Sequence, residues 1–226
     1  MTRRICFGVY ADFLDMIDEK LLREKLMTAY PDAKCELNFK TPFQLLVATI
    51  LSAQCTDKRV NVVTEKLFQV YSTPEQFAAL EPEELEPMIF SCGFYRNKAK
   101  NIIAASRSIV ERFDGQVPVD FDNLLSLAGV GRKTANVVSA NAFGADAIAV
   151  DTHCFRVARR LGISKGKTPE AVERDLAAYF AEGSRAAAHH LLIFHGRYTC
   201  HSRRPDCEHC ILFEQCAYPE KGKDKK

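Results

Sequence analysis

The stretch at 124–142 most constrains the fold, because two short helical segments there flank a pair of glycines. Leucines make the first segment apolar, Gly129-Val130-Gly131 frees the backbone to turn sharply, and a second helix begins directly afterwards. This order predicts a helix-hairpin-helix. Gly-x-Gly by itself is a weak signal, and its simplest interpretation is a surface turn between two helices.

The start of the second helix carries Arg132 and Lys133. The first backbone N–H groups of a helix have no partners within it, so two cations beside them make a site suited to a phosphate. Nucleic acid is therefore the expected partner, and the candidate contacts are Gly129, Val130, Gly131 and Arg132.

An acidic residue, Asp151, follows the hairpin. It ends the apolar run at 147–150 and stands at the start of another helix, Asp151-Thr152-His153, where a carboxylate suits the N-cap. Capping is the ordinary role of an aspartate in that place. If the carboxylate also faced Lys133, the two side chains would form a catalytic pair.

These segments resemble the signature of the endonuclease III DNA glycosylases, within the wider helix-hairpin-helix glycosylase superfamily. The likeness rests on Leu-Ala-Gly-Val-Gly-Arg-Lys-Thr-Ala followed by Val-Asp-Thr-His, and it extends from Glu36 to Cys216. Ala128 departs from the proline that the family usually has before Gly-Val-Gly. The resemblance implies a bifunctional DNA glycosylase and abasic-site lyase that removes oxidised pyrimidines from duplex DNA, with Lys133 as nucleophile and Asp151 as its electrostatic partner.

Four cysteines lie within seventeen residues, with intervening gaps of six, two and five: Cys200, Cys207, Cys210 and Cys216. Thiols at this density predict a metal or a cluster. Their spacing alone does not decide between zinc and iron–sulfur. The resemblance implies a [4Fe–4S] cluster with a structural role, which folds the C-terminal loop against the DNA backbone.

The resemblance also implies that two loops enter the duplex. Gln54 matches a residue that fills the gap left by an extruded base, because an amide offers both a donor and an acceptor. Phe94 stands where the family usually has Leu. Its simplest interpretation is a core residue, but its place between Gly93 and a basic segment favours a wedge between base steps. Asp57 is expected to cap the helix after Gln54. The other expected DNA contacts are Arg96, Lys98, His153 and Arg204, with phosphates as the partners of Arg96, Lys98 and Arg204.

Periodicity along the rest of the chain is helical, with no run of alternating strand residues, which predicts an all-α class. Helices are expected over 13–30, from 41, from 57, from 73 and 81 up to Gly93, and over 99–113, 169–180 and 184–197. The resemblance implies two lobes: a six-helix barrel domain at 35–145, and a discontinuous iron–sulfur domain of 1–34 plus 146–226. The tail at 219–226, with four Lys, is expected to be disordered.

Charge is unevenly distributed, although the formal net charge of +2 says little about nucleic acid. Residues 75–87 carry five Glu and no base, whereas residues 94–112 carry five cations against Glu111 alone. This contrast predicts one face that avoids phosphate and another that meets it.

Cysteine usage and hydropathy point to the cytoplasm. The chain has nine cysteines, an odd number, and five of them are scattered singly as free thiols usually are. The apolar run after Arg3-Arg4 is too short for a signal sequence, and no run approaches the ~20 apolar residues of a membrane span. The protein is expected to act there as a monomer.

Three alternatives remain open at this point. A monofunctional relative resembling the adenine-mismatch glycosylases would lack the hairpin lysine and usually carry an extra C-terminal domain. A non-catalytic iron–sulfur hairpin protein that only binds DNA would need neither Lys133 nor Asp151. A zinc-folded nucleic-acid module would share the four cysteines but would be colourless, whereas an iron–sulfur protein is yellow-brown.

Overall fold

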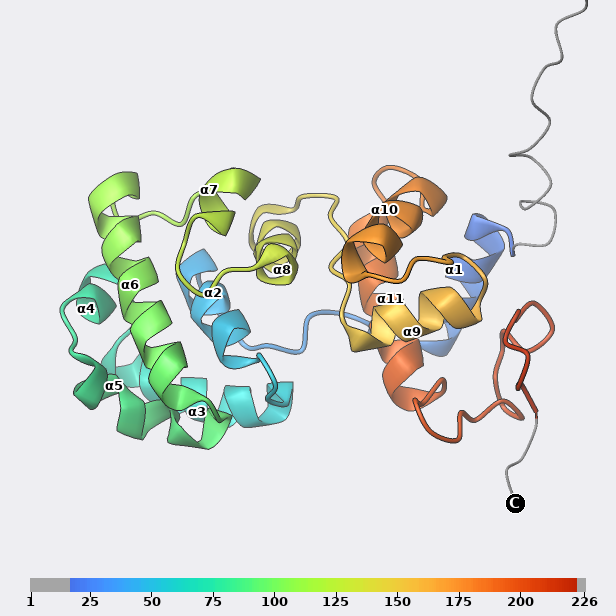
Figure 1. Cartoon of the computed structure of the whole chain (residues 1–226), viewed down its shortest axis with the longest axis horizontal. Coiled ribbons are helices and arrows are strands. Elements are labelled where there is room, and N and C mark those ends of the chain that lie inside the picture. The colour runs from blue at the N-terminus through green and yellow to red at the C-terminus, as the bar shows by residue number, and fades with distance from the viewer. Residues whose placement is uncertain (1–16, 223–226) are drawn as a thin grey trace, which may run out of the picture. The chain divides into compact units, whose positions relative to one another are not determined.

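The computed structural model describes residues 17–222, which form helices, turns and loops without a strand (Figure 1). The predicted all-α class is confirmed. No helix within this range is long and apolar enough to cross a bilayer. The described chain forms two compact units. The hairpin unit runs from Cys35 to Ala149, and the cysteine-loop unit combines the residues before Cys35 with those after Ala149.

Short capped helices make up the hairpin unit. Threonine or aspartate caps most of them, and proline in the first turn fixes φ at several starts. The elements are α2 (Pro42–Leu51), α3 (Asp57–Val70), α4 (Pro74–Ala78), α5 (Pro82–Ile89), a 3₁₀ turn η1 (Phe90–Cys92), α6 (Tyr95–Phe113), α7 (Phe121–Leu125) and α8 (Arg132–Phe143).

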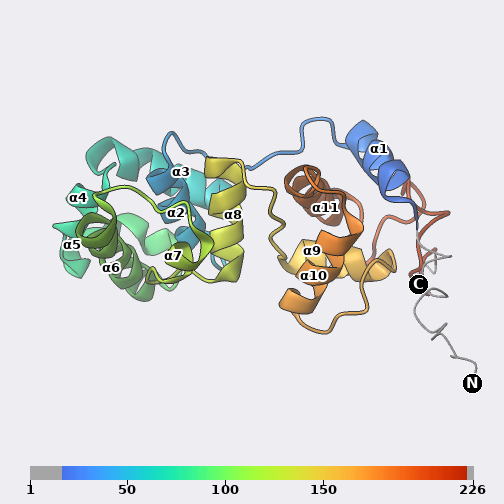
Figure 2. The same cartoon turned by 90° about the horizontal axis from the view of Figure 1, so that it is seen from above.

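Helix α2 lies at the centre of this unit. Every residue from Phe43 to Leu51 is buried, so the helix is enclosed on all sides rather than along one stripe. It packs against α3, α6 and α8, and both views show it amid the other helices of the unit (Figures 1 and 2). Helix α8 of the hairpin is therefore anchored on a fully buried core helix.

Four helices form the cysteine-loop unit: α1 (Glu19–Ala29), α9 (Thr152–Arg160), α10 (Pro169–Tyr179) and α11 (Arg185–Tyr198). Helix α11 packs against both α1 and α9. Gly196 lets α9 approach closely, since a Cβ added there would lie 2.8 Å from the Cβ of His153. Turns without regular structure carry the four cysteines after α11.

One local prediction is corrected. Thr56, rather than Asp57, caps α3: its side chain accepts from the Arg59 N–H, and Asp57 is the first helical residue. In the tail, Lys221 donates to the carbonyl of Phe213 at 2.8 Å and lies over its ring. Residues 223–226, the apolar run after Arg4 and the start of the predicted helix at 13–30 lie outside the described residues.

The acidic and basic segments of the sequence lie against one another in the structure. Helices α4 and α5 pack directly against α6, which brings the acidic segment onto the basic one. Arg107 donates to the carbonyl of Ala78 at 2.9 Å and pairs with Glu81 at 3.3 Å. Arg96 lies 3.8 Å from Glu86. The carbonyls exposed at the end of α4 attract the arginine, and neighbouring glutamates partly offset the charge of α6.

Candidate functional site

The predicted hairpin is present between α7 and α8. Gly129 adopts a φ of 75°, and the Val130 N–H donates to the carbonyl of Leu127 at 3.1 Å to close the turn. A Cβ at Gly129 would lie 2.8 Å from the Cβ of Asn101 on α6. Glycine is therefore required here twice, for its backbone angle and for the close approach of α6.

Lys133 is exposed and stands second in α8. Because the N-cap is Gly131, no side chain caps the first N–H groups of this helix. A Cβ at Gly131 would meet nothing within 4 Å, so the space beside these groups is open. The Arg132 guanidinium lies over the ring of Phe121, 5.3 Å from its centroid. An anion can therefore approach the amides beside the lysine amine.

Asp151 caps α9, as its position predicted. Its Oδ1 accepts from the N–H groups of His153 at 2.9 Å and Cys154 at 2.8 Å. Both bonds use the same oxygen, which leaves Oδ2 out of the cap. The two hydrogen bonds therefore hold this half-buried carboxylate in one orientation.

Two arginines on α9, Arg156 and Arg160, hold the start of the cysteine loop. Arg156 donates to the carbonyls of Gly196 at 2.8 Å and Cys200 at 3.0 Å, and its NH2 lies 3.2 Å from Nδ1 of His153. Arg160 donates to the Cys200 Sγ at 3.3 Å and to the carbonyl of His201 at 2.6 Å. Sequence reasoning missed both residues, although their spacing of four places them on one helix face.

The two predicted insertion residues share an unusual backbone. Gln54 has a φ of 53° and Phe94 a φ of 46°, in the left-handed region that non-glycine residues rarely adopt. Both side chains are exposed, and Phe94 is 66% exposed. The core interpretation of Phe94 is therefore wrong. The nearby Phe90 is 63% exposed and packs on Tyr95, with ring centroids 4.9 Å apart, which extends the aromatic surface beyond the predicted residue.

Lys98 does not present its charge to solvent. It is 5% exposed, and its ammonium donates to the carbonyls of Leu51, Ala53 and Cys92 at 2.7–2.8 Å. These three bonds use all three N–H groups of an ammonium. Burial lowers the pKa of this lysine. The predicted phosphate contact of Lys98 is therefore wrong, whereas Arg96 remains exposed.

The four cysteines of the loop line one pocket beside Arg160, His195 and Phe213. Within residues 17–222, no three His, Cys, Asp or Glu side chains are gathered tightly enough to hold a single metal ion. Burial, together with the neighbouring thiols of Cys200, Cys216 and Cys207, raises the pKa of the Cys210 thiol to about 11. Four thiolates here would repel one another, so a bound cationic centre would favour their ionisation. The donor set fits a thiolate-held cluster.

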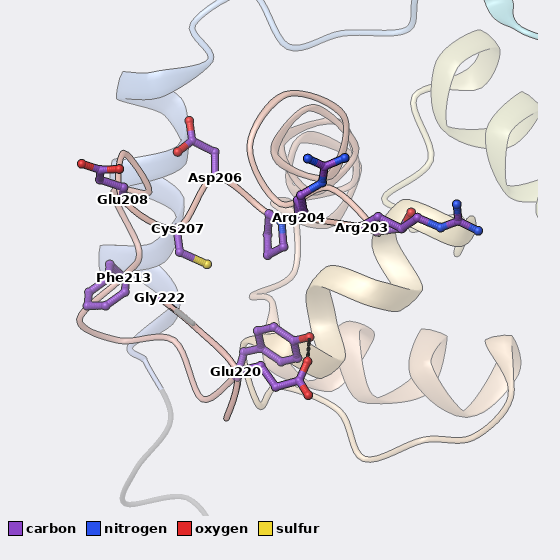
Figure 3. A pocket seen from close by; sticks show the side chains of 11 residues that line it. Arg203, Arg204, Asp206, Cys207, Glu208, Phe213, Glu220 and Gly222 are labelled. Atoms are coloured by element: carbon purple, nitrogen blue, oxygen red, sulfur yellow. Dashed lines mark hydrogen bonds between the residues drawn. The ribbon is translucent and has the colours of Figure 1, made fainter. Parts of the chain in front are cut away.

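An outer pocket adjoins this cysteine pocket and shares Cys207 with it (Figure 3). The Cys207 sulfur points into the outer pocket, and Arg203 and Arg204 extend from its rim. Arg204 is exposed with a φ of 49°. On the far side, the Tyr218 hydroxyl donates to Glu220 at 2.8 Å. The loop thus combines thiols inside with two cations outside.

The four described cysteines outside this loop are thiols, not disulfides. Cys92 and Cys154 are buried, and Cys35 and Cys55 are half-buried. Cys6 lies outside the described residues.

Comparison with known proteins identifies the family of this chain. Residues 47–182 match the family described as "HhH-GPD superfamily base excision DNA repair protein". Endonuclease III of Bacillus subtilis is 50% identical over 204 residues, which cover 90% of this chain and 93% of that protein. Endonuclease III of Escherichia coli is 47% identical over 191 residues, which cover 84% and 90%.

Solved structures agree with these matches. A trapped endonuclease III–DNA covalent intermediate superposes with a TM-score of 0.85 at 44% identity, covering 89% of this chain and 96% of that one. A thermostable thymine-DNA glycosylase, at 23% identity and a TM-score of 0.81, shares the fold. The resemblance inferred from Gly-Val-Gly-Arg-Lys and Val-Asp-Thr-His is confirmed, and the chain belongs to the endonuclease III family of helix-hairpin-helix base excision repair glycosylases.

Proposed function

We propose that Lys133 and Asp151 carry the reaction of this enzyme, a bifunctional DNA glycosylase and abasic-site lyase of base excision repair. The observation that carries the proposal is the place of Lys133, an exposed amine in the first turn of a helix whose leading amides no side chain caps. Those amides bind a backbone phosphate, which holds the sugar of the target nucleotide beside the amine.

The reaction begins when the neutral Lys133 amine attacks C1′ of the sugar. The bond from C1′ to the base breaks, and the base leaves with its electron pair and takes up a proton. Positive charge develops on the sugar as this bond lengthens. The Asp151 carboxylate stabilises that charge and can accept the proton lost by the amine.

The same lysine then drives strand cleavage. The sugar ring then opens: the C1′–O4′ bond breaks, O4′ takes up a proton, and the nitrogen of Lys133 forms a double bond to C1′, which gives the protonated Schiff base. This Schiff base withdraws electrons from C2′, so a base removes a proton from C2′ and the C3′–O bond breaks with the phosphate as leaving group. Water hydrolyses the remaining imine and releases Lys133. One amine therefore accounts for both the glycosylase and the lyase activity.

Oxidised pyrimidines in duplex DNA are the proposed substrates. Extrusion costs a few kcal/mol and is least costly for a damaged base, which favours such lesions. Gln54 pairs with the orphaned base opposite the lesion, and Phe94 stacks in the gap. Gly129, Val130, Gly131 and Arg132 bind the phosphate, and Arg96, His153 and Arg204 contact the DNA further along.

A [4Fe–4S] cluster held by Cys200, Cys207, Cys210 and Cys216 is part of the proposal. It is supported by four thiols lining one pocket, a donor set that thiolate-bound clusters use. When bound, the cluster crosslinks the loop through four iron–sulfur bonds. The residues of the loop hold Arg204 toward DNA. None of the proposed acids or bases of the reaction lies among these cysteines. We place the enzyme in the cytoplasm as a monomer.

Trapping of the Schiff base tests this function. Borohydride added during turnover on a lesion-bearing duplex should reduce the imine and leave the protein covalently joined to DNA. Lys133→Gln should abolish both this adduct and strand cleavage. Its DNA binding should be largely preserved, because the amides from Gly129 to Gly131 are unchanged.

A matched control is Lys165→Gln, a lysine of the cysteine-loop unit outside the proposed site, which should form the adduct normally. If Lys133→Gln still gave adduct at a comparable rate, another amine would be the nucleophile. A monofunctional glycosylase would give no adduct in any variant, including the unmodified protein.

A further inference from the structure

Lys98 connects the two loops that carry Gln54 and Phe94. Its ammonium donates to the carbonyl of Leu51 at 2.8 Å and of Ala53 at 2.7 Å, in the segment that leads into Gln54. It also donates to the carbonyl of Cys92 at 2.8 Å, two residues before Phe94. Leu51 and Cys92 are 41 positions apart in the sequence, yet their carbonyls meet on a single nitrogen.

Burying the Lys98 ammonium costs free energy unless all three of its hydrogen bonds are formed. An ammonium that is 5% exposed has lost most of its hydration, and only charge-assisted hydrogen bonds replace it. Leu51 ends α2, so its carbonyl is among those that the helix leaves unpaired, at the negative end of the helix dipole. A buried cation therefore suits this place, and its position is fixed by three acceptors from two loops.

Both loops contain backbone that needs such support. Gln54 and Phe94 are two of the four non-glycine residues with positive φ in the described chain, and Gly93 has a φ of 69°. Left-handed residues persist only where the surrounding structure holds them. The peptide from Ala53 to Gln54 carries one of the held carbonyls, and the peptide from Cys92 to Gly93 carries another. Lys98 thus holds the peptide that precedes Gln54 and the peptide that precedes Gly93, the residue before Phe94.

We propose that Lys98 is a positioning residue, which fixes Gln54 and Phe94 in the conformations that enter the duplex together. This inference rests on the proposed function, since it assumes that both side chains replace an extruded nucleotide. Preorganisation of the two loops lowers the ordering cost of extrusion, so Lys98 acts on the step before chemistry. It touches neither the sugar nor Lys133 in this account.

The test compares two substrates with Lys98→Met, which keeps the aliphatic stem and removes the donors. On a duplex with a single thymine glycol, an oxidised pyrimidine, base excision should slow by about 10- to 100-fold, as expected when the side chains of Gln54 and Phe94 have to be ordered during extrusion. Cleavage of a preformed abasic site should change by less than about threefold, because no base has to be extruded there. The ratio of the two rates is the readout that general destabilisation does not move.

Ile109→Ala is the matched control, since Ile109 is fully buried about three turns further along the same helix. It should lower the melting temperature while leaving the ratio of the two rates unchanged. Lys98→Arg is a second variant for the case in which Lys98→Met does not fold: it keeps a cation, but its planar donors do not match the three carbonyls, and it should shift the ratio in the same direction. An unchanged ratio in the folded Lys98 variant would overturn the proposal.

Amide hydrogen exchange without DNA separates this inference from the proposed function. Exchange at 53–56 and 93–95 should quicken in the Lys98 variant, whereas exchange in α4, whose end is held by Arg107, should not. If loop exchange became faster but the unmodified enzyme excised no base, Lys98 would still be the residue that holds the two loops, and the proposed function would be refuted. Unaltered loop exchange would refute the role of Lys98 whatever the enzyme excises.

Discussion

The Asp151 carboxylate can serve two purposes because it has two oxygens. Oδ1 caps α9 through two backbone N–H groups, and Oδ2 takes no part in that cap. Asparagine keeps a capping oxygen and loses the negative charge. One substitution therefore separates the structural role from the electrostatic one.

Asp151→Asn should preserve the melting temperature and DNA binding, and it should lower the rate of base excision by roughly 10²-fold or more if the charge stabilises the sugar cation. Single-turnover kinetics together with thermal unfolding measure both effects. A normal excision rate would reduce Asp151 to a helix cap.

Phe94→Ala should slow base excision by about 10-fold, which corresponds to the ~1–3 kcal/mol that a stacked aromatic contributes. Cleavage of a preformed abasic site should be much less affected. Because Phe94 is 66% exposed, the variant should unfold at the normal temperature. Equal losses on the two substrates would contradict its role in extrusion.

Single residues show where sequence reasoning stops. The cap at Asp151 could be predicted because it depends on the residue type and the two residues that follow. The burial of Lys98 could not, since its three acceptors come from segments that only the packing of α2 against α6 brings together. The resemblance and the neighbours of Phe94 favoured an exposed wedge, which agrees with its exposure, whereas no pattern of apolar residues encodes its left-handed backbone angle.

Among the described segments, the cysteine loop carries four thiols but no helix. It has no regular structure after Tyr198. Lys25 of α1 donates to the carbonyl of Ile211 and to Gln215, and Arg156 of α9 donates to the carbonyl of Cys200. Several helices elsewhere have a proline in their first turn, at Pro42, Pro74 and Pro169, and these prolines indicated the helix starts in the sequence. The loop has no comparable signal besides its cysteines.

Purified protein should bind about four iron atoms and no stoichiometric zinc, with a visible absorbance that is lost in Cys207→Ser or Cys210→Ser. Cys154→Ser is the control, because this cysteine lies in α9, outside the loop, and should leave the absorbance intact. Iron and zinc analysis of anaerobically prepared protein measures the outcome. Stoichiometric zinc would refute the cluster.

For the whole molecule, the distribution of accessible cations matters more than their number. Arg107 pairs with Glu81 and Lys98 is buried, so two of the five bases in the basic segment already have partners within the protein. Sequence counting could not foresee this, because it treats a charged segment as a charged surface. Arg96 and Arg204 remain exposed.

Neutralising Arg96 or Arg204 should weaken binding to all DNA sequences and reduce the slope of log K against log[salt] by about one unit each. Lys98→Met should leave that slope unchanged, since its ammonium already donates to three carbonyls. Titrations of DNA binding at several salt concentrations measure this slope for each variant. An unaltered slope in both arginine variants would place the phosphate contacts elsewhere.

The missing side chain at Gly196 determines how the cysteine-loop unit can change by mutation. A single added methyl group would strike His153, whose ring lies against Arg156, and Arg156 in turn holds the carbonyls of Gly196 and Cys200. A substitution at Gly196 would thus displace both His153, a proposed DNA contact, and Cys200, the first cysteine of the loop. One substitution at Gly196 can therefore alter both His153 and the start of the cysteine loop. A second substitution that compensates for the effect on one of them has to be made at the other.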